Sequence, residues 1–572
     1  MAIFKKHLWT TAFVILVVLT FTLEGSGVSR GREIAFLLIL ASPFFLLLTD
    51  FLNHRVLSAP KVLAVLTAAF LFFCLISTIF SGDKQTSFEY LLLYLSLSLV
   101  ALSIYNHKDE VTNVLPKLIV SLAFLFSLLT LAIKIFSGVY PNLIPDTGYQ
   151  LVFPAFGSHN HLGDFLVLAI LICIYQVVIE KSKLYWSLLI LFIPFFIFSY
   201  SRSAYLSLEI ILLLLTIHFV KNKLINWRTF KFAGLVFSLA LLATLFLATV
   251  GEFKNTPILE NVHENLISEA NLGDKYFLGR RLEFARQAWQ SFVEKPFWGI
   301  GPGNFVLVSK AHSQILAFST DSSHNLFLDI LSENGIFSLI LFLTIIILVF
   351  KRSDRNKPLN FLLLTALLLN FQTDYTFRIY GLALLTAILL GVNYQANQNF
   401  KISGKLLVLT SIVISILASL IFVGSELSQN NPQQALKLYP LNKHAYLQLS
   451  KQNGMSEERI NATVQFFPGD PEILHLAAKY YEDRGEKERA LEYYMRSYQV
   501  SSFEDFNVVI RIYNLKKELE GDESAFSFLQ THFERMRSAA NLSYLPGNYR
   551  REIIKFCSEK DVSCPPIWLS IF

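Results

Sequence analysis

Apolar stretches of about 17 to 25 residues recur along the chain from near residue 7 to near residue 424. Each is long enough to cross a hydrocarbon core of roughly 30 Å as a helix, which satisfies its own backbone hydrogen bonds. The pattern predicts an all-α polytopic membrane protein with about 12 to 13 transmembrane helices. Beyond residue 424 polar residues dominate, so we expect a membrane domain over 1–424 and a tail over 425–572.

Basic residues divide the loops into two sets. The first set is rich in Lys and Arg and includes Lys181, Lys183, Lys351 and Arg352. The second set carries few basic residues, Arg202 among them, and is therefore poor in positive charge. The positive-inside rule places the N-terminus and the rich set in the cytoplasm. An odd number of spans then puts the long loop 251–324 and the tail 425–572 on the extracytoplasmic side.

Composition agrees with this assignment. Hydrophobic residues make up 53% of the chain and charged residues 16%, which excludes an ordinary soluble domain. The cytoplasmic loops account for most of the net charge of +6, so the charge gives no reason to expect a nucleic-acid partner.

The tail contains two related stretches, and the second resembles a tetratricopeptide repeat (TPR). Leu474, Tyr481, Ala490 and Tyr494 stand at offsets typical of its two packed helices, with Gly485 in the turn. We therefore expect a short TPR-like stack, because single repeats need neighbours to bury their faces. Such a stack would serve as a docking surface for a glycan, a peptide or a partner protein, or as a plain scaffold.

Two cysteines lie close together near the end of the tail. Cys557 and Cys564 would meet an oxidising environment outside the membrane, which favours a disulfide between them. Without histidine neighbours they make a poor zinc site.

Two common catalytic motifs are missing from the sequence. There is no GxxxxGK[ST] or HExxH, and the glycine-rich run from Gly299 to Phe305 is interpreted as a tight turn. The first outer loop, Glu24 to Glu33, has no Asp-x-Asp-like pair and the inner loops have no aspartate cluster, whereas a divalent ion would need paired carboxylates. We therefore expect neither a metal nor a cofactor.

The predicted outer face instead carries cations and one histidine. They are Arg202, Arg280, Arg281 and His324, with Asn325 beside the histidine. Arginine holds phosphate oxygens through two parallel donors, and histidine takes a proton from a hydroxyl near neutral pH. The set suits transfer from a lipid diphosphate, although each arginine alone is more simply an interfacial anchor.

Four segments carry a resemblance to a known family. They are FGSHNHLGDFLVL (156–168), SRSAYLSL (201–208), RLEFARQAW followed by PFWGIGPGNF (281–305), and SSHNLFLDILSENG (322–335). In this order they resemble the O-antigen ligase family, which also includes O-antigen polymerases and some bacterial oligosaccharyltransferases. The family is similar in architecture, with many spans, a long outer loop before a late helix and often a helical-repeat tail.

The resemblance implies an inverting, metal-independent glycosyltransferase in the bacterial cytoplasmic (inner) membrane. Its donor would be an O-antigen or related polysaccharide on undecaprenyl diphosphate, and its acceptor a hydroxyl of a glycan, lipid or protein outside the membrane. Arg202 and Arg281 would contact the diphosphate, and His324 would act as the base or orient the acceptor. Arg280 stays an alternative to Arg281.

Other residues are assigned supporting roles. Asn160 and His161 match the family's Asn-rich turn, where capping a helix is the simpler role for Asn160. Glu333 and Gly335 are expected to shape a helix break, with contact to a sugar hydroxyl as the alternative for Glu333.

Asp374 and Arg378 fall in the last outer turn among the spans, and we expect them to form an ion pair without a catalytic role.

The acceptor decides among activities within the family. Lipid A core would make the protein a ligase, the growing glycan a polymerase, and a protein serine an O-oligosaccharyltransferase. A flippase or transporter for lipid-linked sugars is a separate hypothesis, which predicts internal repeats and charges deep in the spans. An inactive membrane scaffold is a third, and it predicts no loss of glycan when His324 is changed.

Overall fold

The chain is seen in a computed structural model of helices joined by short turns. The structure describes residues 2–24, 29–53, 56–136, 158–224, 227–247, 277–313, 319–354, 358–374, 376–452, 455–501, 506–539, 555 and 557–558. Within these ranges, eight helices are long and apolar enough to cross a membrane. They are α2 (Ser29–Asn53), α3 (Lys61–Ile79), α4 (Lys84–Asn106), α5 (Lys108–Phe136), α6 (His159–Glu180), α8 (Arg202–Lys221), α13 (Leu326–Arg352) and α16 (Gly404–Leu427).

Shorter apolar helices occupy the remaining predicted spans. They lie within α1 (Ala2–Glu24), α7 (Lys183–Phe198), α9 (Trp227–Leu247), α14 (Pro358–Asn370) and α15 (Tyr380–Asn393). The prediction of an all-helical, multi-pass membrane protein is therefore confirmed.

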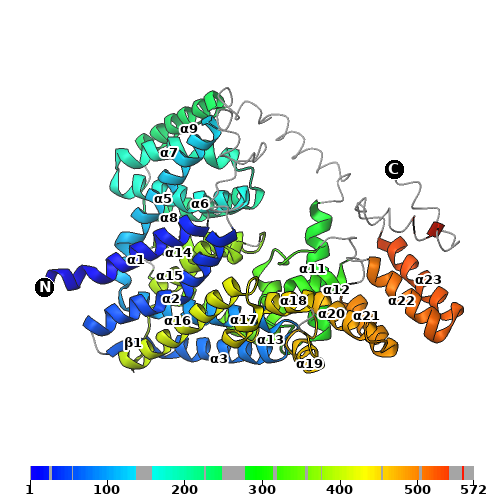
Figure 1. The fold of residues 1–572 in the computed structure, drawn as a ribbon. Helices are drawn as coiled ribbons and strands as arrows, with labels where there is room; N and C mark the ends of the chain where they lie inside the picture. The colour runs from blue at the N-terminus through cyan, green and yellow to red at the C-terminus, as the bar shows by residue number, and fades with distance from the viewer. Residues whose placement is uncertain are drawn as a thin grey trace.

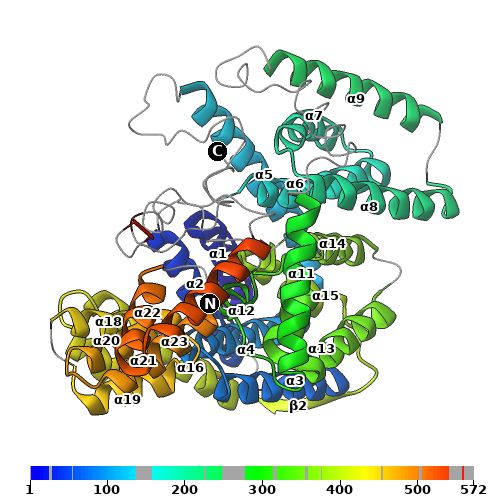
Figure 2. The ribbon, with the colours of Figure 1, turned by 90° about the vertical axis from the view of Figure 1, so that its right-hand side faces the viewer.

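The membrane helices form two groups in Figures 1 and 2. Helices α5 to α9 make one group, α2, α3, α4, α13 and α16 make the other, and α14 and α15 lie between them. Helix α6 is central, and its residues from Phe165 to Cys173 are almost fully buried. Helices α3 and α9 instead expose many apolar side chains, as lipid-facing helices do.

A small sheet was not predicted. Strands β1 (Val56–Pro60) and β2 (Asn399–Ser403) pair antiparallel, with Val56 opposite Ser403. The sheet joins the α2–α3 connection to the α15–α16 connection.

Helices continue through the tail. They are α17 (Pro432–Leu438), α18 (Lys443–Lys451), α19 (Glu457–Phe466), α20 (Pro471–Glu482), α21 (Lys487–Val500), α22 (Phe506–Glu520) and α23 (Asp522–Ala539). Helices α20 and α21 pack as a hairpin around the predicted residues Leu474, Tyr481, Ala490 and Tyr494, with Gly485 at φ 77° in the turn. The helical hairpin is confirmed, and its assignment as a TPR stays a prediction.

The tail docks on the membrane helices beside the α3–α4 turn. The Gly469 amide donates to the Gly82 carbonyl at 3.0 Å, and a Cβ on Gly469 would lie 3.2 Å from the Cα of Gly82. Lys443 pairs with Asp470 at 2.8 Å and with Asp83 at 3.6 Å. Burial acts to lower the pKa of Lys443, but the two carboxylates outweigh it and raise that pKa.

Helix α13 breaks at Gly335, as the sequence predicted. Gly335 has φ 78° and ψ 178°, a backbone conformation that is essentially restricted to glycine. A Cβ there would overlap the carbonyl of Phe297, so the break also lets the 296–303 turn pack against α13.

We expect Gly335→Ala to destabilise the protein by at least about 2 kcal/mol, because alanine would be both strained and overlapped. The matched control is Gly234→Ala on α9, where a Cβ meets nothing within 4 Å; its effect should stay within about 1 kcal/mol. Thermal unfolding in detergent measures both. An unchanged melting temperature for Gly335→Ala would contradict this account of the break.

Candidate functional site

His324 is held in a tight turn directly before α13. The Asn325 side chain caps the helix by accepting from the amides of Phe327 and Leu328. His324 itself has φ 59°, a left-handed conformation that is uncommon for a residue with a side chain. The turn is tied to α13 by Asp329, which accepts from the Ser322 hydroxyl at 2.6 Å and the Ser323 amide at 2.7 Å.

Asp374, just beyond α14, reaches His324 from across the fold. Its Oδ1 lies 2.9 Å from His324 Nδ1 and 3.7 Å from a terminal guanidinium nitrogen of Arg281. The Asp374 side chain is buried, whereas Arg281 remains about a quarter exposed. Two of the predicted site residues therefore converge on a carboxylate to which the sequence analysis gave no catalytic role.

The charge of Asp374 is stabilised by its neighbours. Burial acts to raise the pKa of Asp374, but the hydrogen bond with His324 and the positive charges of His161 and Arg281 outweigh it and lower that pKa to about 2. An ionised Asp374 accepts, so His324 donates through Nδ1 and its Nε2 becomes the proton-accepting nitrogen. His161, predicted as a supporting residue, thus belongs to the same cluster.

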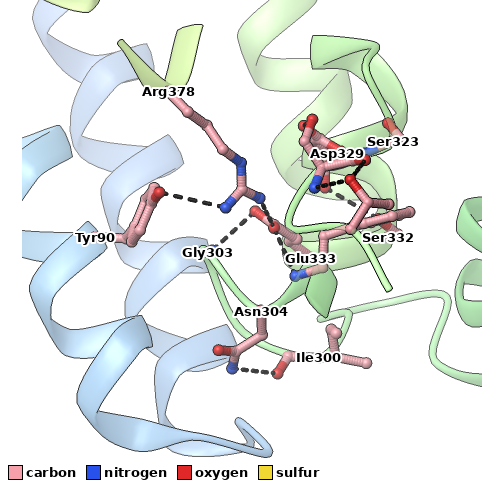
Figure 3. Close-up of polar contacts among 12 residues, drawn as sticks. Tyr90, Ile300, Gly303, Asn304, Ser323, Asp329, Ser332, Glu333 and Arg378 are labelled. Carbon is pink, nitrogen blue, oxygen red and sulfur yellow. Dashed lines mark hydrogen bonds and ion pairs between the residues drawn. The ribbon is translucent and has the colours of Figure 1, made fainter. Parts of the chain in front are cut away.

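A second ion pair lies deeper, at the α13 break. Arg378, in the short helix η4 (Thr376–Arg378), donates to Glu333 at 2.7 Å and to the Tyr90 hydroxyl at 3.3 Å, as Figure 3 shows. Burial acts to lower the pKa of Arg378, but Tyr90 and Glu333 outweigh it and raise that pKa. The predicted Asp374–Arg378 pair is thus wrong, because each residue has a nearer partner of opposite charge: Asp374 pairs with Arg281 and Arg378 with Glu333.

Glu333 also holds the glycine-rich turn. Its two carboxylate oxygens accept from the amides of Gly303 and Phe305 at 2.9 and 3.0 Å (Figure 3). Asn304, next to them, donates to the hydroxyls of Ser81 and Ser87. The run from Gly299 to Phe305 is the predicted tight turn, with positive φ at its three glycines, and it leads into α12 (Phe305–His312).

Arg202 begins α8, whose first turn packs against the first turn of α6. A Cβ at Gly163 would lie 2.7 Å from the Cβ of Ser201, so the two helix starts are in close contact. The predicted capping role of Asn160 is wrong: Ser158 caps α6 and accepts from the Asn160 amide. Ser158 is better placed because it is the last residue before the helix.

The structure describes three other predicted residues only in part. The side chain of Arg280 and all of Cys564 lie outside the described residues, so the choice between Arg280 and Arg281 and the proposed disulfide stay predictions. Cys557 is buried and disulfide-bonded.

An apolar cavity of about 320 Å³ adjoins the ion pairs. It lies among α3, α4, α13 and α15, with Leu63, Phe70, Tyr94, Ile330, Phe342 and Phe377 in its wall. Tyr94, Ile330 and Phe377 also line a smaller pocket that contains Asp374, Glu333 and Arg378. An apolar space and a charged pocket thus share a wall.

Sequence analysis missed the structural partners of this site. Tyr90 and Asp329 lie inside apolar spans, where only their polarity distinguished them. Asp329 stands five residues after His324 in the same motif, and that proximity is the signal that would have found it.

Comparison with known proteins bears on the same part of the chain. Residues 186–343 match the family model of the O-antigen ligase. The matched segment contains Arg202, Arg281, His324 and Glu333, and it ends before Asp374, Arg378 and the tail. The match supports an O-antigen ligase- or polymerase-type function, and with it a glycosyltransferase-like activity in general. No curated protein and no solved structure matches the chain.

Asp374→Asn should lower the melting temperature in detergent at pH 7, because the amide keeps the shape but loses the charge. A carboxylate with a lowered folded-state pKa stabilises the fold above its unfolded pKa of about 4, and that contribution is lost as the pH falls towards 2. The difference in melting temperature from wild type should therefore shrink as the pH falls from about 4 to about 2, the window between the two pKa values.

The matched control is Asp483→Asn, at an exposed aspartate of the tail. This substitution should change the melting temperature little, at pH 7 as well as at low pH. A difference for Asp374→Asn that stayed constant with pH would contradict the ionised pair.

Proposed function

We propose that this protein transfers a glycan from undecaprenyl diphosphate to an acceptor hydroxyl at the outer face of the cytoplasmic membrane. The observation that carries the proposal is the convergence of Arg281, His324 and Asp374 at one point beside the membrane helices. This convergence supports a phosphate-binding role for Arg281 and a base role for His324 towards one substrate.

The step is a single displacement at the anomeric carbon. The acceptor hydroxyl gives its proton to Nε2 of His324 as its oxygen bonds to that carbon. The bond from the anomeric carbon to the diphosphate oxygen breaks, and its electron pair leaves with the lipid diphosphate. Attack opposite the leaving group inverts the configuration of the sugar.

Each residue of the cluster has a distinct part in this step. Asp374 orients His324 through Nδ1 and stabilises the imidazolium that forms. Arg281, with its partly exposed guanidinium, stabilises the charge that grows on the departing diphosphate, and Arg202 assists from the start of α8. No step needs a metal ion.

The apolar cavity supports a lipid-linked donor. Its wall of aliphatic and aromatic side chains suits an isoprenoid chain, and three of its residues also line the charged pocket. A polyprenyl diphosphate has the same two parts, an apolar chain joined to a doubly charged head.

We expect His324→Ala to reduce transfer by roughly 100- to 10,000-fold, the usual contribution of a general base. The assay uses purified undecaprenyl-diphosphate glycan in liposomes, with lipid A core, free glycan and serine-containing protein as acceptors and mass spectrometry as the readout. The acceptor that gains mass distinguishes ligase, polymerase and oligosaccharyltransferase.

His444→Ala, at an exposed histidine of α18, is the matched control and should be fully active. A folded His324→Ala variant with normal activity would remove the base role. EDTA in the same assay should leave the product unchanged, and a strict requirement for Mg²⁺ or Mn²⁺ would refute the metal-independent mechanism. If wild type gives no product with any acceptor, a lipid-flipping assay tests the transporter alternative.

Arginine-to-lysine substitutions test the diphosphate clamp. Lysine keeps the charge but offers no planar pair of donors, so Arg281→Lys should lose at least roughly 10-fold in kcat/KM, and Arg202→Lys should lose activity as well. Arg280→Lys, one position away, serves as the comparison that assigns the role. Normal kinetics in both Arg280→Lys and Arg281→Lys would refute the clamp.

A further inference from the structure

Helix α11 (Phe277–Glu294) has an inverted distribution of polarity. Three of its large apolar side chains are exposed: Leu282 is 64% exposed, Trp289 56% and Val293 61%. Glu283, Gln287 and Ser291 on the other side are buried. A helix on the surface of a water-soluble domain shows the opposite arrangement.

The three exposed residues form one stripe. At about 100° per residue, positions 282, 289 and 293 fall within roughly 40° of one another around the helix axis. The buried polar side is held by its own bonds: Glu283 pairs with Arg286 at 2.6 Å and accepts from Gln287, and Arg286 donates to the His312 carbonyl. Glu283, Arg286 and Gln287 are therefore bonded within the protein, whereas Leu282, Trp289 and Val293 are exposed.

The stripe is continuous with the lipid-facing surface of the membrane helices. Beyond the end of α11, Phe297 and Trp298 are also exposed. Trp298 stacks on Phe80 at the end of α3, with ring centroids 5.2 Å apart, and Phe297 stacks on Phe337 of α13 at 6.0 Å. The exposed apolar surface of α11 thus merges with that of two membrane-spanning helices.

The position of α11 fits a helix that lies in the membrane surface. In both Figure 1 and Figure 2 it runs across the direction of α3 and bridges the two groups of membrane helices. It lies on the tail side, because the turn that follows it contacts Gly82, which also contacts the tail at Gly469. Tryptophan is enriched at the interface between membrane and water, which agrees with Trp289 and Trp298 on this surface.

We propose that α11 is an interfacial helix whose stripe of Leu282, Trp289 and Val293 is immersed in the acyl chains of the leaflet on the tail side. Phe297 and Trp298 extend this contact to the end of α3. The partner of this surface is lipid, and a second protein is disfavoured because the stripe continues directly into surfaces that already face lipid.

Immersion of the stripe has a consequence for the site. Arg281 directly precedes Leu282, so its side chain leaves the helix about 100° from the stripe, towards Asp374. A helix anchored in this way keeps that guanidinium at the depth of the lipid headgroups. This consequence rests on the proposed function, whereas the lipid contact itself does not.

Nitroxide labels on single added cysteines test the proposal without any assay of activity. Leu282→Cys, Trp289→Cys and Val293→Cys are labelled in liposomes, and their collision rates with oxygen and with a water-soluble nickel chelate are compared. Val65→Cys on the exposed face of α3 is the lipid reference, and Glu488→Cys on α21 is the water reference. The unsubstituted protein, treated identically, gives the background from native cysteines.

Labels at 282, 289 and 293 should resemble Val65→Cys, with oxygen collisions dominating. Labels at 289 and 293 that behave like Glu488→Cys would overturn the proposal, and so would labels shielded from both reagents, since a protein partner would then cover the stripe. Lipid-like labels in a protein that transfers no glycan would refute the proposed function alone.

Discussion

The carboxylate of Glu333 joins parts of the fold that are distant in sequence. It accepts hydrogen bonds from the amides of Gly303 and Phe305 and pairs with Arg378. Glu333 itself stands two residues before the break at Gly335. A buried carboxylate without such partners would be strongly destabilising, because its charge would lie in a region of low dielectric constant. With them, it ties the glycine-rich turn, the α13 break and the η4 segment into one unit.

The cluster at His324 depends on that unit. Arg378 follows Asp374 by four residues, so the anchoring of Arg378 on Glu333 also places the carboxylate that orients His324. His324 lies directly before α13 and Glu333 lies within that helix, so α13 connects the His324 cluster to the Glu333–Arg378 ion pair. Asp374 thus contacts the histidine, whereas Glu333 holds the glycine-rich turn and Arg378.

On the tail side of the membrane helices, buried polar side chains lie beside exposed apolar ones. Within α11, Gln287 donates to Glu283, and Asn304 of the glycine-rich turn donates to Ser81, while Trp289, Phe297 and Trp298 are exposed. The tail adds a second buried polar contact through Lys443, Asp83 and Asp470. The tail helices are thus attached to the same turn that contacts the glycine-rich segment, which makes the tail a neighbour of the candidate site.

Much of the architecture could be predicted from the sequence, because each membrane helix satisfies its own backbone and is recognised from local hydrophobicity alone. The helix break at Gly335, the turn from Gly299 to Phe305 and the helical hairpin around Gly485 are local for the same reason. The partners of His324, Arg281 and Arg378 were not predictable in this way, because Asp374 and Glu333 reach them across 50, 93 and 45 positions of sequence. By itself the sequence determined which segments enter the membrane and which residue types are available for chemistry. Only the tertiary structure decided which charges meet, because the pairing of buried ions depends on distances of a few ångströms between helices that sequence spacing does not encode.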